Sequence, residues 1–291
     1  MSSPAWPHDQ NPLPEHPPRP LRRGVALLPS LFTVANLGMG WVAIQQSVLA
    51  LQTPQPAGLL DAAAKAIGWC ILLDGLDGRV ARLANASSAF GREFDSLADV
   101  ISFGVAPGLL AYVWGLRFLT LGPSLAMGLN RAAQIVMFLF VVAGAARLAR
   151  FNIAPRDSCP SNPGKPGKRY FVGLPIPAAA GMIAAVVHFF ASPSFVFTAV
   201  NTSGSLAILW LALILCLAWL MVSTWRFYSF KDIDLRRRHP YVVMVTLAAL
   251  VAVIWFYSEV VLLGLAVLYV GTAVVWRMSY YWHRHQRRAA E

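Results

Sequence analysis

The chain has 291 residues, of which 57% are hydrophobic and only 13% are charged. Soluble domains carry about 25% charged residues, so this composition excludes an ordinary soluble protein and indicates an integral membrane protein. The net charge of +11 does not indicate nucleic-acid binding, because Lys and Arg lie at the edges of apolar runs and form no basic stripe interleaved with aromatic residues.

The predicted elements begin after a tail at residues 1–24, whose first twenty residues hold seven prolines and no apolar core. This composition predicts a disordered segment rather than a signal peptide. A membrane-spanning helix needs about 20 mostly apolar residues. Seven stretches meet this requirement, and they lie at 31–51, 97–116, 132–150, 171–192, 205–222, 241–257 and 260–277. An eighth stretch, 59–83, is weaker because it holds six charged residues, namely Asp61, Lys65, Asp74, Asp77, Arg79 and Arg82.

The distribution of positive charge supports the weak helix. With eight helices, the connections at 52–58, 117–131, 193–204 and 258–259 fall on one side, and they hold only Arg117 and Arg131. The tails and the remaining connections hold most of the other Lys and Arg residues. Because positive charge accumulates on the cytoplasmic side, we expect both termini in the cytoplasm. The sequence thus predicts an all-α integral membrane protein with about eight transmembrane helices.

An acidic stretch interrupts this apolar pattern. Five of the thirteen acidic residues of the chain fall between Asp74 and Asp99. Asp74 and Asp77 are three residues apart and Asp95 and Asp99 four apart, so each pair lies on one face of a helix. With a turn expected near 84–92, the two pairs can converge at the cytoplasmic face. Glu93 fits neither pair and is expected to be solvated.

Converging carboxylates at a membrane interface repel each other and are costly to desolvate, so cations must compensate them. Hard oxygen ligands suit Mg²⁺, Mn²⁺ or Ca²⁺, and two divalent ions on shared carboxylates suit phosphoryl chemistry. Arg82 is placed to contact a phosphate. The alternative is that the aspartates form interfacial salt bridges with Arg79, Arg82 and Arg92.

The spacing D-x2-D-G-x2-A-R-x8-G-x3-D-x3-D resembles the signature of the CDP-alcohol phosphatidyltransferase family. All eight fixed positions of the signature are present, namely Asp74, Asp77, Gly78, Ala81, Arg82, Gly91, Asp95 and Asp99. The resemblance covers residues 25–225 and implies a six-helix core. Two additional transmembrane helices at 226–279 and a basic cytoplasmic tail at 280–291 would follow this core.

This resemblance implies a membrane enzyme that transfers a phosphate-containing group from a CDP-alcohol to a second alcohol and releases CMP. The four aspartates would bind two divalent cations, Mg²⁺ or Mn²⁺, and Asp99 would act as general base toward the acceptor hydroxyl. The segment "PSLFTVAN" resembles the donor-lining segment of the family, although Ser30 stands where many relatives carry Asn. The implied contacts to the CDP-lipid are Ser30, Thr33, Asn36, Gly78, Ala81, Arg82, Ser88 and Gly91.

Three further strings, "LFTVANLGMGWVAI", "ARLARFN" and "FVGLPIPAAA", resemble the branch of the family that uses serine as acceptor. This implies transfer of a phosphatidyl group from CDP-diacylglycerol to L-serine at a bacterial inner membrane, and it is compatible with a homodimer. A guanidinium binds a carboxylate in bidentate fashion, so Arg147 and Arg150 are candidate acceptor ligands, with Asn152 as a hydrogen-bond partner. The alternative is that both arginines only anchor the helix end at the membrane surface.

Other functions remain open at this point. The loop 154–170 supplies Lys165, Lys168 and Arg169, which would suit a phosphorylated acceptor such as glycerol 3-phosphate or inositol phosphate. Intramembrane carboxylates also line the ion paths of cation transporters. That alternative predicts acidic residues near the middle of several membrane helices, whereas here they gather at one face of the membrane. An inactive scaffold is disfavoured because the signature is intact.

Overall fold

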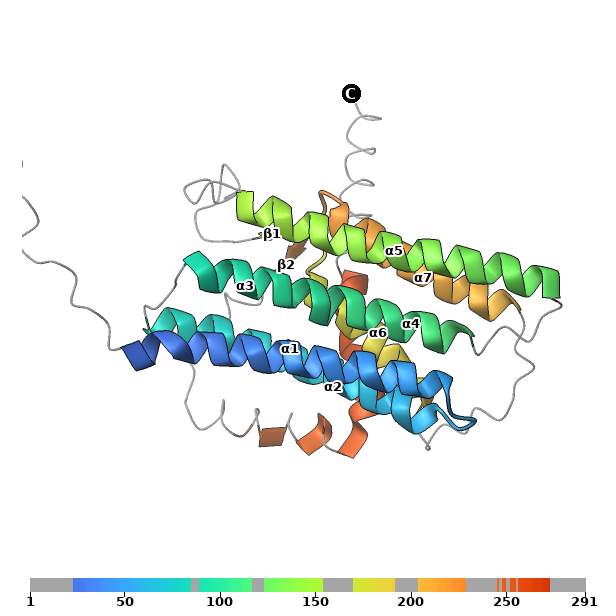
Figure 1. Cartoon of the computed structure of the whole chain (residues 1–291), viewed down its shortest axis with the longest axis horizontal. Coiled ribbons are helices and arrows are strands. Elements are labelled where there is room, and N and C mark those ends of the chain that lie inside the picture. The colour runs from blue at the N-terminus through green and yellow to red at the C-terminus, as the bar shows by residue number, and fades with distance from the viewer. Residues whose placement is uncertain are drawn as a thin grey trace, which may run out of the picture.

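The computed structural model describes residues 23–84, 89–116, 123–153, 170–191, 204–228 and 256–272, with a few isolated residues between 245 and 254. Long helices lie side by side and form an elongated bundle (Figure 1). The predicted N-terminal tail lies outside the described residues except for its last two, Arg23 and Gly24, which begin the first helix. The basic tail at 280–291 also lies outside them.

The first two helices, α1 (Arg23–Leu51) and α2 (Ala57–Ala84), pack along each other as an antiparallel pair. The short connection between them contains Pro54 and Pro56. Proline lacks the N–H group that a helix interior needs, so α1 ends before these residues and α2 begins after them. The weak helix predicted at 59–83 is therefore confirmed as a helix despite its charges.

A continuous helical rod follows, made of α3 (Ala89–Asp99), the π-helix η1 (Val100–Val105) and α4 (Ala106–Leu116). The N–H of Ala106 donates to the carbonyl of Ile101, five residues back. Pro107 cannot donate to the carbonyl of Phe103, and its ring crowds that carbonyl, which favours a wider turn just before it. The rod begins eight residues before the predicted start at 97, because its first turns are too polar for a hydropathy window.

The remaining long helices are α5 (Pro123–Ile153), α6 (Ile176–Ala191) and α7 (Gly204–Val222). The helix α5 packs along α7, and α6 packs along α2. The predicted start of the fifth helix at 171 is wrong, because Tyr170–Val172 forms a strand, β1, which pairs antiparallel with β2 (Arg226–Tyr228). Each strand has three residues, so the ribbon is a small addition to an all-α bundle.

Gly173 explains why the chain can turn between β1 and α6. Its φ angle is +80°, a conformation that residues with a Cβ rarely adopt. A Cβ at this position would lie 2.5 Å from the carbonyl oxygen of Met221, so the turn is also packed tightly against the end of α7. Pro175 then precedes α6, and Pro177 is its second residue, as expected for prolines at a helix start.

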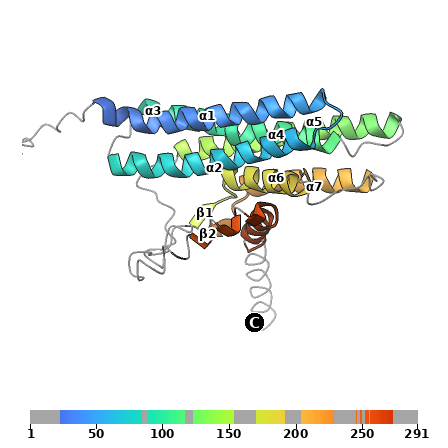
Figure 2. The same cartoon turned by 90° about the horizontal axis from the view of Figure 1, so that it is seen from below.

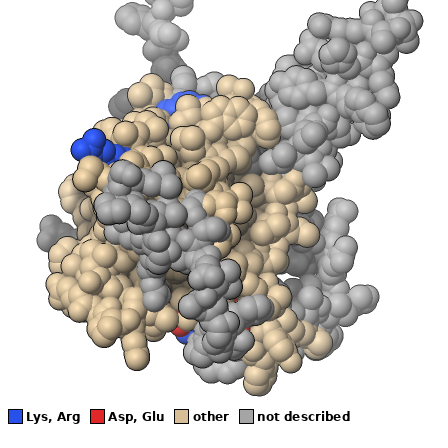
Figure 3. All heavy atoms as spheres, turned by 90° about the vertical axis from the view of Figure 1, so that its right-hand side faces the viewer, with Lys and Arg blue, Asp and Glu red and all other residues tan. Residues whose placement is uncertain are grey.

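Four described helices are long and apolar enough to cross a membrane, namely Leu31–Leu51, Phe90–Gly115, Ala126–Ile153 and Ser205–Val222. Large apolar side chains on these helices, such as Trp41, Phe138 and Trp219, are exposed on the outside of the bundle, where lipid would cover them. The end of the bundle that carries the α1–α2 connection shows few charges among its described atoms (Figure 3). The predicted all-α integral membrane protein is confirmed, while the number of eight helices stays a prediction.

The apolar helix Phe256–Thr272 has a different direction from the rest. It runs across the other helices rather than along them (Figures 1 and 2). Its side chains Ala266, Tyr269 and Val270 pack against the buried core. The turn predicted at 258–259 is wrong, because both residues lie inside this helix and Ser258 finds a partner on α6.

Candidate functional site

A carboxylate cluster forms where α2 and α3 lie close together. Oxygen atoms of Asp74, Asp95 and Asp99 all lie within 4.8 Å of one another. The spacing explains this convergence, because Asp95 and Asp99 lie one turn apart on the same face of α3 and Asp74 faces them from α2. The structure thus brings together three of the four aspartates that the sequence singled out.

The surroundings of this cluster fit a divalent cation. Asp99 is only 9% exposed, and its Oδ1 atom is buried without a hydrogen-bond partner among the described residues. An ionised carboxylate in such a position is costly unless a positive charge compensates it. Three hard oxygen donors from Asp74, Asp95 and Asp99 supply the ligand type that Mg²⁺ and Mn²⁺ prefer. The cluster is therefore better explained as a cation site than as a group of carboxylates with a purely structural role.

The fourth aspartate is held by α1. Asp77 is buried, and its Oδ2 atom accepts a hydrogen bond of 2.5 Å from the Thr33 hydroxyl. Asp77 does not belong to the group of oxygen atoms within 4.8 Å, yet it is an electrostatic neighbour of both Asp95 and Asp99. It therefore lies beside the cluster with one carboxylate oxygen oriented by Thr33.

Asn36, also expected on the donor side, occupies an unusual position on α1. Its backbone carbonyl accepts from Cys70 Sγ at 3.4 Å and from Ser102 Oγ at 3.2 Å. Its side-chain amide is buried, and neither the nitrogen nor the oxygen has a partner among the described residues. A buried amide without partners is expected to have a ligand or water as its partner when the site is in use.

Sequence reasoning missed the contact of α1 with η1. A Cβ at Gly40 would lie 2.6 Å from Ser102 Oγ, so the two helices approach closely only because this position is glycine. Ser102 lies three residues after Asp99, in the π-helical segment. The signal that could have found this contact is the small residue Gly40 on the same face of α1 as Asn36 and Thr33.

The other expected donor contacts are described less completely. Gly91 is half-buried on α3. At four of the remaining positions, namely Ser30, Gly78, Ala81 and Arg82, the structure describes the helical backbone but not the side chain. Ser88 lies outside the described residues. The predicted contacts of these residues with a CDP-lipid stay predictions, as does the salt-bridge alternative for Arg79 and Arg82.

On the acceptor side, Arg147 is the residue that reaches the interior. It is 7% exposed, and its Nε atom has no partner among the described residues. The guanidinium carbon lies 4.6 Å from the ring centroid of Phe151, and Asp99 is one of its electrostatic neighbours. A buried cation near the carboxylate cluster, with donor capacity left over, can bind an anionic group.

The two other predicted acceptor residues make contacts with the protein. Arg150 is exposed and directs Nη1 toward the carbonyl of Val222 at 3.5 Å. Asn152 is also exposed and donates from Nδ2 to Ser96 Oγ at 3.0 Å, which ties the end of α5 to α3. Their predicted role in acceptor binding stays a prediction, and both also help to hold helix ends together.

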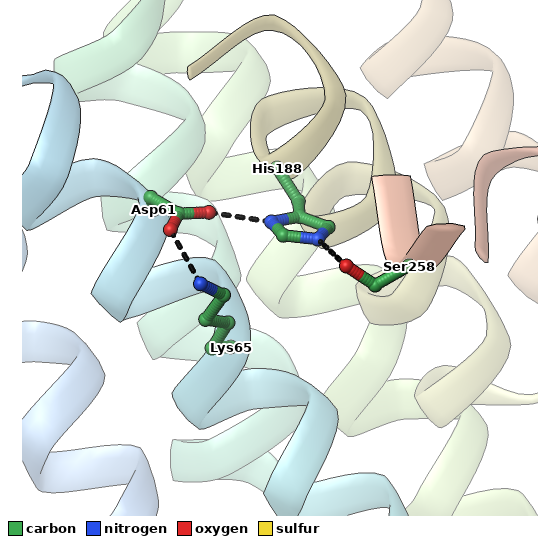
Figure 4. Close-up of polar contacts among 4 residues, drawn as sticks. All are labelled: Asp61, Lys65, His188 and Ser258. Atoms are coloured by element: carbon green, nitrogen blue, oxygen red, sulfur yellow. Dashed lines mark hydrogen bonds and ion pairs between the residues drawn. The ribbon is translucent and has the colours of Figure 1, made fainter. Parts of the chain in front are cut away.

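A second polar cluster lies at the other end of α2 (Figure 4). His188 on α6 contacts Asp61 Oδ1 through Nδ1 at 2.5 Å and Ser258 Oγ through Nε2 at 2.9 Å. The other oxygen of Asp61 pairs with Lys65 at 2.8 Å. Both ring nitrogens of His188 thus have partners within the protein. Local sequence patterns could not predict its partners Asp61 and Ser258, because they lie on two other helices that are distant in the sequence.

Known proteins of one family resemble this chain. The sequence model of the CDP-alcohol phosphatidyltransferase family matches residues 26–203. A Helicobacter pylori protein named CDP-diacylglycerol–serine O-phosphatidyltransferase is 40% identical over 208 residues, which cover 71% of this chain and 74% of that protein. A Mycobacterium bovis protein of the same name is 39% identical over 174 residues, or 58% of this chain and 53% of that protein. An archaetidylserine synthase from Methanothermobacter thermautotrophicus is 36% identical over 155 residues, or 53% and 54%.

Proposed function

The chain belongs to the CDP-alcohol phosphatidyltransferase family, and from that premise we propose that it transfers the phosphatidyl group of CDP-diacylglycerol to the hydroxyl of L-serine. The products are phosphatidylserine and CMP. The relatives named CDP-diacylglycerol–serine O-phosphatidyltransferase support this choice of donor and acceptor. The observation that carries the proposal is the convergence of Asp74, Asp95 and Asp99 near the buried cation Arg147.

Four aspartates would hold the metal. Asp74, Asp95 and Asp99 offer three oxygen atoms within 4.8 Å, and Asp77 offers a further carboxylate oriented by Thr33. Shared carboxylates of this number suit two divalent cations, Mg²⁺ or Mn²⁺. When bound, such cations neutralise the charge on a pyrophosphate and on the phosphoryl oxygens of the transition state.

Asp99 is the residue that we assign to proton transfer. Its Oδ1 atom lacks a partner among the described residues, so one oxygen can bind a cation while the other accepts a proton. The serine hydroxyl loses its proton to Asp99, and its oxygen forms a bond to the lipid-side phosphorus. The bond from that phosphorus to the CMP oxygen breaks, and CMP leaves with the electron pair.

The donor side is formed by α1 and the C-terminal part of α2. Thr33 orients Asp77, and the buried amide of Asn36 offers a donor and an acceptor to the CDP headgroup. We place Ser30, Gly78, Ala81, Arg82, Ser88 and Gly91 along the same headgroup by their positions in the family signature. The exposed apolar side chains of α1 leave the acyl chains of the donor in contact with the bilayer.

The acceptor side depends on Arg147. L-serine carries a carboxylate, an ammonium group and a hydroxyl, and Arg147 and Asp99 each have one buried polar atom without a described partner. A serine molecule can satisfy both, with its carboxylate at Arg147 and its hydroxyl at Asp99. Arg150 and Asn152 would complete the binding of the amino acid from the end of α5.

We further propose that the protein works at the bacterial inner membrane, with the active site and both termini facing the cytoplasm. The concentration of Lys and Arg at one end of the predicted topology supports this orientation. CDP-diacylglycerol would reach the site laterally from the cytoplasmic leaflet, and serine would enter from solution. A homodimer is compatible with the large apolar surface of the bundle, and crosslinking in membranes would test it.

The experiment that tests the function is an acceptor panel with purified protein, CDP-diacylglycerol and a divalent cation. L-Serine, glycerol 3-phosphate and inositol phosphate are supplied in parallel, and CMP release and the lipid product are measured. We expect CMP release with serine alone. CMP release with a phosphorylated acceptor instead would support a transferase of this family and refute serine as its acceptor. Cation flux in proteoliposomes without CDP-lipid would support a transporter.

A further inference from the structure

A single backbone carbonyl joins three helical segments next to the carboxylate cluster. The carbonyl of Asn36 on α1 accepts from Ser102 Oγ in η1 at 3.2 Å and from Cys70 Sγ on α2 at 3.4 Å. All three residues are buried, and the two contacts span 66 and 34 residues of sequence. These three residues, which we call the Asn36 junction, therefore fix how α1 lies against α2 and η1.

Gly40 is the residue that lets η1 approach the Asn36 junction. It lies one helical turn after Asn36, and a Cβ there would lie 2.6 Å from Ser102 Oγ and 3.0 Å from Ser102 Cα. A larger residue would push α1 and η1 apart. A Cβ at Gly38, by contrast, would have no such neighbour within 4 Å among the described residues. The two glycines share a helix and differ in what they face.

The Asn36 junction adjoins the proposed active site along all three segments. Each of its members lies three or four residues from a residue of that site, which is about one helical turn. A displacement at the junction is therefore expected to move the site residues with it. The neighbouring pairs are Thr33 and Asn36 on α1, Cys70 and Asp74 on α2, and Asp99 and Ser102 across the boundary of α3 and η1.

The most direct connection to the site runs along α1. The Thr33 hydroxyl donates to Asp77 Oδ2 at 2.5 Å, so this contact also joins α1 to α2. A hydrogen bond weakens steeply when its distance and angle change. The orientation of the Asp77 carboxylate thus depends on where α1 lies, and the donation from Ser102 to Asn36 holds α1 from the side of η1.

We propose that Ser102 is a positioning residue of the transferase, which holds α1 through the Asn36 carbonyl so that Thr33 orients Asp77. This inference rests on the proposed function. Ser102 is 0% exposed and its hydroxyl donates to a backbone carbonyl, so we assign it no contact with the substrates or the cations. Its effect on the reaction passes through the position of α1.

The first test is the kinetics of Ser102→Ala in the full-length protein, with rates given per folded protein. We expect kcat/KM for CDP-diacylglycerol to fall about threefold to fivefold, within the range of one lost neutral hydrogen bond. KM for serine should stay within about twofold. Ser47→Ala is the matched control, because Ser47 is also 0% exposed and its hydroxyl donates to Ala43 within α1. Equal losses in the two serine variants would overturn the inference.

A double-mutant cycle tests the route through Thr33. Thr33→Val removes the hydroxyl that orients Asp77. If Ser102 acts by placing that hydroxyl, Ser102→Ala should lower kcat/KM little further in a protein that already carries Thr33→Val. Full additivity of the two changes would show that Ser102 does not act through Thr33, and it would refute the proposal.

Binding of Mn²⁺ provides a measurement that needs no turnover. Free Mn²⁺ is measured by electron paramagnetic resonance during titration of the purified protein without substrates. Losing a hydrogen bond to a metal ligand costs about tenfold or more in affinity, so we expect that rise in Kd for Thr33→Val. Ser102→Ala, one contact further away, should raise Kd about twofold to fivefold, and Ser47→Ala should not. A Kd for Ser102→Ala equal to that of the wild type would count against the proposal.

The two glycines provide a comparison at constant chemistry. Gly40→Ala and Gly38→Ala add the same methyl group and the same helix propensity to α1. We expect Gly40→Ala to lower kcat/KM for CDP-diacylglycerol at least about tenfold, and Gly38→Ala to stay within about twofold. Similar activities in the two variants would contradict the proposed role of the Asn36 junction. Ser102→Ala introduces no clash, so it keeps the test decisive if Gly40→Ala does not fold.

Failure of this inference is distinguishable from failure of the proposed function. The wild-type acceptor panel reports whether serine supports CMP release, and it does not depend on Ser102. Without that reaction the proposed function fails, and the inference fails with it. A normal serine reaction in which Ser102→Ala behaves like Ser47→Ala leaves the function intact and removes only the positioning role.

Discussion

Two polar clusters lie on α2, and they differ in how many of their buried polar atoms have partners among the described residues. Asp61 and Asp74 are separated by about 20 Å along this helix. Around Asp61, each charge and each ring nitrogen of His188 has a partner. Around Asp74, three carboxylates face one another and Asp99 keeps a buried oxygen without a described partner. The first cluster is complete among the described residues, whereas the second brings together three oxygen donors that could hold a cation.

This difference provides a criterion for distinguishing structural from functional roles of buried polar residues. A satisfied cluster can be explained by the stability and specificity that it gives to the fold. A cluster of like charges has no such explanation, because it opposes folding until a cation binds. Each prediction below tests one side of this comparison.

The largest effect is expected from removal of divalent cations. Exhaustive chelation should lower CMP release by at least about a thousandfold, because cation charge on the phosphoryl oxygens is worth several kcal/mol. Added Mg²⁺ or Mn²⁺ should restore activity. Wild-type turnover after thorough chelation would refute the interpretation of the aspartate cluster as a metal site.

The next effect is that of Asp99→Asn, which keeps the shape of the side chain and removes its charge and basicity. We expect kcat to fall about a hundredfold to a thousandfold, the usual contribution of a general base. The matched control is Asp61→Asn in the satisfied cluster, which should retain kcat within about threefold at saturating serine, once folded protein is quantified. Equal losses in both variants would remove the distinction between the clusters.

A smaller effect is expected from Thr33→Val, which removes the hydroxyl that orients Asp77 at nearly constant volume. A hydrogen bond to a charged group is worth about 1.5–3 kcal/mol, so we expect kcat/KM for CDP-diacylglycerol to fall about tenfold. Thr33→Ser keeps the hydroxyl and should recover most of the lost kcat/KM. Ser47→Ala is the control on the same helix, because the hydroxyl of Ser47 donates to the carbonyl of Ala43 within α1.

The sequence predicted the convergence of three aspartates far better than it predicted the structure around them. Asp74, Asp95 and Asp99 could be placed together because helix periodicity relates residues within α2 and α3. The close approach at Gly40 and the π-helical turn after Asp99 depend on how helices pack, and local sequence carries only weak signals for such features.

The same reason explains the errors in the fold. Hydropathy windows detect apolar length, so they place the start of α3 eight residues late and treat Phe171 and Val172, which lie in β1, as part of a helix. The direction of Phe256–Thr272 and the partners of His188 come from contacts over 70 residues or more. No periodicity within a segment can report a contact at that separation.

The satisfied cluster is expected to act on stability rather than on chemistry. His188→Ala leaves Asp61 with Lys65 alone and removes the partner of Ser258. We expect the free energy of unfolding to fall by about 1–3 kcal/mol, seen as a lower Tm in detergent. His188→Asn should lose less, because its amide can keep one of the two hydrogen bonds. A Tm equal to that of the wild type would show that the contacts of His188 with Asp61 and Ser258 are not needed to hold the helices together.

The smallest effect should come from Lys65→Met, and it decides which partner of Asp61 matters. The Lys65 side chain is 57% exposed and pairs with Asp61 one helical turn away, so solvent screens the interaction. Such a pair is worth about 0.3–0.5 kcal/mol, and methionine keeps the apolar stem and the helix propensity. We therefore expect a Tm within about 1 °C of the wild type. A loss as large as that of His188→Ala would mean that the charge of Asp61 is balanced mainly by Lys65 rather than by the contact with His188.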